Sequence, residues 1–173
     1  MKKILFVAIL SIMYVSTIVA QEKYLGARIG YNATYFQNDG SKIGETQDNY
    51  FVSIYKDTKI IPFLFFQSGL EYTKAGGSVN QHDYAIHYLG VPLGIKAKLG
   101  PLFVTGGATF NVRISEKNNL FENSSKWYDT NVFAQAGVEI LFLTLDVKYI
   151  WGLTNIQNDM TNHGVQAGIG FRF

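Results

Sequence analysis

The sequence predicts an all-β protein: an eight-stranded antiparallel up-and-down transmembrane β-barrel, preceded by a cleaved signal peptide. Three observations predict this fold class. The first twenty residues have the pattern of an export signal, and apolar and polar residues alternate along most of the remaining chain. The connections between these segments are short and long in turn along the chain, as in outer-membrane barrels.

The N-terminal segment predicts export. Lys2 and Lys3 precede an apolar run that begins at Ile4 and continues with few polar breaks to Ala20. A basic start, an apolar core and a small residue before the cut are the parts of a secretory signal. We therefore expect residues 1–20 to be the signal peptide and residues 21–173 to be one outer-membrane β-barrel domain. A retained N-terminal anchor is the alternative, but no helical domain follows and the next segment reads as a strand.

Composition excludes several kinds of site. The expected mature chain has 13 basic and 13 acidic residues, because the signal contains two lysines and no acidic residue. A neutral chain gives no electrostatic reason to expect a nucleic-acid partner. The absence of cysteine excludes disulfides and thiolate metal sites. An aromatic content of 15% with 17 Gly and 3 Pro is typical of a β-rich chain with aromatic residues at a membrane interface.

The segment 24–36 shows the alternation most clearly. One face carries apolar or amphipathic side chains: Leu25, Ala27, Ile29, Tyr31, Ala33 and Tyr35. The other face carries polar or small residues: Gly26, Arg28, Gly30, Asn32 and Thr34. A period of two with one apolar and one polar face predicts a strand between two different environments.

The same period recurs along the chain. Clear alternation is present at 87–99, 102–115, 130–140, 143–154 and 164–173, and weaker alternation at 61–74. The segment 49–55 is short and aromatic on both faces, so its orientation stays open. Together these segments make eight strands, most of them near the length of about 9–11 residues that a tilted strand needs to cross a bilayer.

The connections predict which end of the barrel faces outward. Those at 56–59, 100–101 and 141–142 are short, whereas those at 37–48, 75–83, 116–127 and 155–163 are longer and polar. Outer-membrane barrels have short periplasmic turns and long extracellular loops. We therefore expect the long connections to lie outside the cell.

Glycines decide between a membrane barrel and a soluble barrel, which would hide its apolar face. Ten glycines fall on the polar face: Gly26, Gly30, Gly69, Gly90, Gly94, Gly107, Gly137, Gly152, Gly168 and Gly170. Glycine weakens a strand, so a water-facing surface has no reason to collect it, whereas a narrow interior needs the space. The apolar face is then the outer, lipid-facing one.

This assignment places nine charged residues in the interior: Arg28, Glu71, Lys96, Lys98, Arg113, Glu139, Asp146, Lys148 and Arg172. Unpaired charge in a confined space is costly, so we expect these side chains to pair and plug the lumen. Six basic residues against three acidic ones leave a positive surplus. A narrow anion-preferring conduit is therefore the alternative.

Several segments resemble the PorT-like family of outer-membrane β-barrel proteins. They are FFQSGLEYTKAGG at 65–77, YLGVPLGIKAKLG at 88–100, the Gly-rich strand at 102–115 and YIWGLTNI at 149–156. The resemblance covers the whole mature chain and implies fold and location better than activity. Some relatives are associated with protein secretion across the outer membrane, but no motif here transfers that role. The terminal GIGFRF, ending at Phe173, resembles the signature that the barrel-assembly machinery reads.

The sequence predicts no catalytic residue, no cofactor and no metal site. Its three histidines, His82, His87 and His163, lack the spacing of a catalytic triad or a known metal site. We expect an integral bacterial outer-membrane protein that contacts lipid, the assembly machinery during biogenesis, and an unidentified extracellular or membrane partner through its outer loops. The alternatives are a small lipid-modifying enzyme centred on His163 or His87, and a narrow channel.

Overall fold

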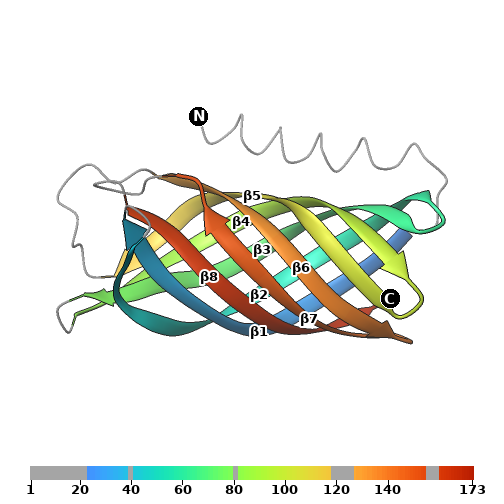
Figure 1. The fold of residues 1–173 in the computed structure, drawn as a ribbon, viewed down its shortest axis with the longest axis horizontal. Helices are drawn as coiled ribbons and strands as arrows, with labels where there is room; N and C mark the ends of the chain where they lie inside the picture. Colours follow the sequence, from blue (N-terminus) through green and yellow to red (C-terminus); the bar gives the residue numbers. More distant parts are fainter. Residues whose placement is uncertain (1–22, 39–40, 80–81, 118–126, 155–159) are drawn as a thin grey trace.

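The structure is a computed structural model that describes residues 23–38, 41–79, 82–117, 127–154 and 160–173. Eight strands account for nearly all of these residues (Figure 1). Their bounds are β1 (Lys23–Asn38), β2 (Ser41–Ile61), β3 (Leu64–Val79), β4 (His82–Leu99), β5 (Leu102–Lys117), β6 (Tyr128–Ile140), β7 (Leu143–Gly152) and β8 (Met160–Arg172). No helix long and apolar enough to cross a membrane is present among these residues.

The strands close into a barrel in sequence order. Each strand pairs antiparallel with its neighbours, and β1 closes the ring by pairing with β8 through matches such as Ile29 with Ile169. This confirms the predicted up-and-down topology. Closure leaves no sheet edge open, since every strand has a partner on both sides.

One end of the barrel carries tight turns, which we call the turn end; the opposite end is the loop end. The turns are at Pro62 and Phe63, at Gly100 and Pro101, and at Leu141 and Phe142. Gly100 and Leu141 adopt positive φ angles of 59° and 54°, the left-handed conformation that tight hairpin turns use. The C-terminus lies at the turn end as well (Figure 1).

The connections beside β2 differ from those predicted. The predicted turn at 56–59 lies inside β2, which continues to Ile61. Most of the predicted loop at 37–48 is also strand, because β1 and β2 remain paired up to Asn38 and Ser41. Likewise β3 and β4 stay paired up to Val79 and His82. The prediction relied on the alternation of apolar and polar side chains. Here the backbone pairing continues past the point where that alternation stops.

The two remaining long connections can be compared only in part. Glu116 and Lys117 belong to β5, and Met160–His163 belongs to β8. The central parts of these connections, 118–126 and 155–159, lie outside the described residues.

Side-chain burial confirms the predicted faces. Outward positions are apolar and exposed, for example Ile29 at 54%, Val104 at 57% and Val147 at 54%. Inward positions are buried and mostly polar, so the core is a polar lumen inside an apolar wall. The structure also settles the orientation of 49–55: Phe51, Ser53 and Tyr55 are buried, whereas Val52 and Ile54 are exposed.

Two adjacent glycines in β5 show why the lumen collects this residue. A Cβ at inward-facing Gly107 would collide with the carbonyl oxygen of Leu93 and approach the Cα of Gly94 to 2.6 Å. A Cβ at outward-facing Gly106 would meet no atom within 4 Å. The interior glycines are therefore required by close approach across the barrel wall and lumen.

Candidate functional site

Charged side chains fill the lumen nearest the turn end. Glu139, on β6, accepts hydrogen bonds from Lys96, Lys98 and Arg172. Lys96 also bonds Asp57 of β2 with an Nζ to Oδ2 distance of 2.7 Å. Glu139, Lys96 and Asp57 are each at most 5% exposed. Together with Arg172 of β8, they join β2, β4, β6 and β8 inside the barrel.

A second cluster lies in the middle of the lumen. The Lys148 ammonium lies 2.9 Å from Oε2 of Glu71, and Gln166 donates to Oε1 of the same carboxylate at 3.0 Å. Arg28 pairs with Asp146, with an Nε to Oδ2 distance of 2.9 Å, and its guanidinium reaches Glu71 at 4.0 Å. We call the two clusters together the ion-pair layer.

Aromatic rings complete the ion-pair layer. The Lys96 ammonium lies 4.4 Å from the ring centre of Phe103, and the Lys148 ammonium 4.9 Å from that of Phe133. The Arg28 guanidinium lies 5.0 Å from the ring centre of Phe51. A cation over a desolvated ring face is attracted by the ring quadrupole. Charged side chains and aromatic rings therefore fill this part of the lumen together.

The predicted interior charges can now be placed. Six of them are buried in the ion-pair layer: Arg28, Glu71, Lys96, Glu139, Asp146 and Lys148. Lys98 and Arg172 bond Glu139 but remain partly open at the turn end, with side chains 27% and 12% exposed. Arg113 lies near the loop end and is half-buried. Asp57 was not among the predicted interior charges, because the sequence pattern predicts a turn at 56–59 where the structure continues β2.

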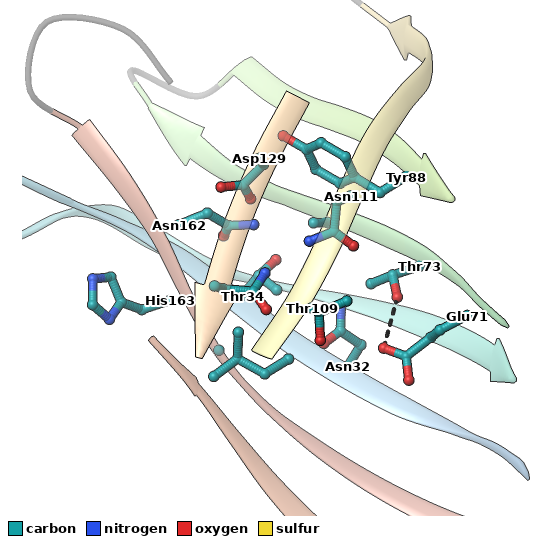
Figure 2. Close-up of a pocket in the computed structure, with 14 residues that line it drawn as sticks. Asn32, Thr34, Glu71, Thr73, Tyr88, Thr109, Asn111, Asp129, Asn162 and His163 are labelled. Atoms are coloured by element: carbon teal, nitrogen blue, oxygen red, sulfur yellow. Dashed lines mark hydrogen bonds between the residues drawn. The ribbon is translucent and has the colours of Figure 1, made fainter. Parts of the chain in front are cut away.

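The lumen nearer the loop end has a different chemistry. A cavity of about 20 Å³ is lined there by amide, hydroxyl and a few other groups, and we call it the amide chamber (Figure 2). This volume is enough for about one water molecule. The polar lining residues include Asn32, Thr34, Glu71, Thr73, Thr109, Asn111, Asp129, Asn131, Asn162 and His163. Ala75 and Tyr88 line it too and pack with buried Ile86.

Aromatic side chains ring the outer wall toward the loop end. Tyr50 and Tyr72 pack with ring centres 6.0 Å apart, and Tyr149 and Trp151 with ring centres 4.4 Å apart. At the turn end Phe142 stacks on Phe171 at 6.2 Å. Aromatic belts at two levels of an apolar wall are typical of membrane interfaces.

The two histidines with described side chains, His87 and His163, belong to this belt of aromatic residues and lie on different strands. His87 lies 2.6 Å from the Tyr72 hydroxyl, and His163 lies 2.9 Å from the Thr161 hydroxyl and stacks on Tyr35. The side chain of His82 lies outside the described part of the structure. Within the described ranges, no group of three or more His, Cys, Asp or Glu residues is arranged to hold a metal ion.

Comparisons with known proteins agree with this architecture. A sequence model of the family described as outer membrane protein β-barrel domain matches residues 19–158. The attachment invasion locus protein Ail of Yersinia pestis, in complex with the heparin analogue sucrose octasulfate, has a TM-score of 0.56 at 17% identity, covering 88% of this chain and 99% of Ail. Neisserial surface protein A has a TM-score of 0.57 at 14% identity, covering 87% of this chain and 97% of that protein. No curated protein sequence matches the chain.

Proposed function

The chain belongs to the family of outer membrane protein β-barrel domains, and from this premise we propose that it is an interaction protein that binds a partner through its loop end. It is located in the bacterial outer membrane. The apolar wall faces lipid, so the soluble-barrel alternative is wrong. The proposal concerns what the barrel does in that membrane.

The ion-pair layer is the observation that carries the proposal. It spans the lumen with carboxylates and cations that bond one another, and aromatic rings occupy the space between them. A solute crossing the barrel would have to break several buried ion pairs. Breaking each pair would leave buried charges uncompensated, at a high cost in free energy. The lumen is therefore poorly suited to transport, which favours an outer surface as the working part.

The loop end supplies such a surface. Strands β1 to β4 continue past the belt of aromatic residues on the outer wall. In this part of β2, Lys42, Glu45 and Asp48 are exposed. The four segments predicted as long connections contain seven acidic residues: Asp39, Glu45, Asp48, Asp83, Glu116, Glu122 and Asp159. They contain three basic residues: Lys42, Lys117 and Lys126. An excess of acidic residues in these segments favours a cationic partner over a polyanion, so we propose a partner with a basic face.

A binding experiment on the folded protein in liposomes tests this choice. We expect polylysine to bind in a salt-sensitive manner, and heparin not to bind. Neutralising exposed acidic residues of the loop end with Glu45→Gln and Asp48→Asn should weaken polylysine binding, whereas the matched change Lys42→Gln should not. Binding of heparin in preference to polylysine would contradict the proposal, and would instead extend to this chain the kind of ligand seen with Ail.

We further propose that the protein has no catalytic activity. The two described histidine side chains lie on β4 and β8, which are not neighbouring strands, and their hydroxyl partners are Tyr72 and Thr161. Neither hydroxyl belongs to a serine nucleophile of a hydrolase triad. A phospholipid hydrolysis assay with folded protein in detergent tests this directly. Activity that disappears in His87→Ala or His163→Ala would contradict it.

Three finer expectations remain proposals. We propose membership of the PorT-like branch, cleavage after Ala20, and recognition of the C-terminal strand by the barrel-assembly machinery. The last is supported by the exposure of Phe171 and Phe173 at 49% and 73%, which leaves both rings accessible at the end of β8. Mass spectrometry of protein from outer membranes should find Gln21 at the N-terminus. A mass that includes residues 1–20 would contradict cleavage.

A further inference from the structure

The three tight turns of the turn end carry no charged or hydrogen-bonding side chain. With one strand residue on each side, their sequences are IPFL at 61–64, LGPL at 99–102 and ILFL at 140–143. Turns that face water commonly contain Asn, Asp and Ser, whose side chains suit both the turn and the solvent. The turn end is therefore apolar at the positions where a water-facing hairpin would be polar.

These turns expose apolar side chains more fully than the rest of the described structure does. Leu141 is 87% exposed, Leu99 80% and Phe173 73%, and all three lie at the turn end. Val147, in the middle of the lipid-facing wall, is 54% exposed. Exposed apolar surface that is concentrated in one place marks a contact with a membrane or with another protein.

Leu141 adopts a conformation that leucine rarely has. Its φ angle of 54° is in the left-handed region, and no other non-glycine residue among those described has a positive φ. Gly, Asn and Asp tolerate this region at a lower cost. Geometry alone would thus favour one of these residues at this position. The leucine indicates that an apolar side chain is itself needed there.

Main-chain hydrogen bonds hold the turns in place. In each turn, one carbonyl oxygen accepts a bond from the strand that follows the hairpin. The N to O distances are 2.9 Å from Lys98 to Phe63, 2.7 Å from Glu139 to Pro101 and 2.8 Å from Arg172 to Phe142. Backbone groups that are paired within the protein suit a lipid environment, since lipid tails offer them no partner.

The length of β7 places the turns at the boundary of the hydrocarbon. This strand has 10 residues, close to the 9–11 or so that a tilted strand needs to cross a bilayer. Tyr149 and Trp151 mark the interface toward its loop end. The opposite end of β7 directly follows Leu141 and Phe142. This turn therefore lies level with the headgroups of the other leaflet.

The charge of the turn end discriminates between headgroups. The basic residues with described side chains there are Lys56, Lys59, Lys96, Lys98 and Arg172, and the acidic ones are Asp57 and Glu139. The carboxylate of the C-terminal residue is also at this end, so the formal surplus is two positive charges. Both acidic side chains are buried, whereas Lys98 is 27% exposed. Basic side chains beside a bilayer attract anionic headgroups.

We propose that the turn end is a lipid-binding surface. Its apolar turns insert into the headgroup region of the adjacent leaflet, and its positive charge binds anionic phospholipid there. Exposed Leu102 and Leu143 on the outer wall adjoin the turns, so one lipid-facing surface continues from the wall onto them. This continuity favours lipid over a second copy of the chain as the cover. The inference does not depend on the partner proposed for the loop end.

Site-specific labelling of the full mature protein tests the position of the turns, because the chain has no cysteine. Leu141→Cys, Val147→Cys and Glu45→Cys each carry one polarity-sensitive fluorophore in phosphatidylcholine liposomes, with iodide on both sides of the membrane. All three positions are exposed, so the label does not disturb the lumen. Iodide should quench the Leu141 label about threefold less than the Glu45 label, because the turn is inserted at the acyl boundary. The Val147 label gives the fully protected reference.

A second measurement tests the preference for anionic lipid. The fluorophore is placed at Leu99→Cys, beside Lys98, and the quencher is phosphatidylglycerol or phosphatidylcholine with a nitroxide near the start of one acyl chain. Phosphatidylglycerol should quench about twofold more strongly at low salt, and the difference should vanish at high salt. Lys98→Gln should reduce the difference, since Glu139 keeps two other cationic partners and the cluster stays paired. The loop-end control Lys42→Gln should leave it unchanged.

Three outcomes would overturn the proposal. Equal quenching of the Leu141 and Glu45 labels by iodide would place the turns in water. Protection of Leu141 that disappears when the protein is diluted in lipid would mean that a second copy covers the turns. Equal quenching by the two nitroxide lipids at low salt would mean that the turn end does not select anionic headgroups.

Discussion

The ion-pair layer and the amide chamber occupy the same lumen but solve the problem of burial differently. In the ion-pair layer, long charged side chains reach across the barrel to partners such as Asp146 for Arg28, and each charge is compensated. In the amide chamber, the side-chain oxygens of short Asn and Thr residues lie near the carboxylate of Asp129 without a hydrogen-bond partner of their own among the described residues. In the first region every carboxylate has a cationic partner, whereas the second contains a cavity of about 20 Å³.

Glycine distribution explains why the two regions differ in their contents. In the ion-pair layer a Cβ at Gly26 would collide with the Tyr55 ring, and one at Gly168 would lie 2.9 Å from the Phe51 ring. These glycines free the volume that rings and long cationic side chains need. The chamber residues are shorter and leave a cavity instead of filling it. Side-chain length thus separates a filled region of the lumen from one that contains a cavity.

The largest expected effect comes from breaking the ion-pair layer. Glu139→Gln keeps the shape of the side chain but leaves Lys96, Lys98 and Arg172 without their shared anion. Removing one partner of a buried ion pair typically costs about 3–5 kcal/mol, so we expect a loss of that size in the free energy of unfolding. Urea unfolding in detergent measures it. Exposed Glu45→Gln should change stability by less than about 0.5 kcal/mol, and equal effects of both variants would contradict the comparison.

The outer wall gives a reference for the cost of charge without a partner. Arg at Ala136 or Val147, both exposed on the lipid face, should cost about 2–4 kcal/mol in bilayers because the guanidinium lies in hydrocarbon. Arg at Thr130, on the same face of β6 near the loop end, should cost about 0–1 kcal/mol. Unfolding from liposomes compares the three variants. A harmless Arg at Ala136 and Val147 would mean that the faces are inverted.

Glycine substitution tests the close packing of the lumen. Gly107→Ala should destabilise by about 1–3 kcal/mol, since the new methyl group meets the backbone of Leu93 and Gly94. Its neighbour provides the control: Gly106→Ala points into open space and should be neutral or stabilise by up to about 1 kcal/mol. The difference in urea midpoint between the two variants is the relevant quantity. Similar midpoints would show that the lumen tolerates added volume.

The smallest effect is expected in the amide chamber. Thr109→Val replaces a hydroxyl that has no described partner with a methyl group of similar size. We expect a change in the free energy of unfolding within about 0.5 kcal/mol, or a slight stabilisation. The measurement is the same urea unfolding experiment. A loss comparable to that of Glu139→Gln would mean that the hydroxyl has a structural partner, and that the two regions are equally dependent on polar contacts.

The sequence predicted the barrel because strand period and residue faces are local properties. Alternation at 24–36 and 130–140 identified strands, inward faces and outward faces, and the structure confirms all three. The interior position of residues such as Arg28 and Glu71 followed from the same period. The even number of strands and the tight turns at Gly100 and Leu141 then determined the up-and-down order.

Contacts between distant strands could not be predicted in the same way. Arg28 and Asp146 are 118 residues apart, and a period of two says that both face inward but not that they meet. Asp57 was missed because β2 lacks clean alternation near its end. The chamber was missed because Asn32, Asp129 and Asn162 each look like an ordinary inward polar residue. Only the closed register brings their oxygens to one cavity.

Single-channel recording tests most directly the claim that the lumen is sealed and that the loop end is the working surface. Wild-type protein refolded into planar bilayers in concentrated potassium chloride should leave the current at the level of the bare membrane, because the ion-pair layer blocks the path. Insertion is verified by protease protection of the same preparation. Discrete, anion-selective current steps that scale with the amount of inserted protein would contradict this account and establish the conduit alternative.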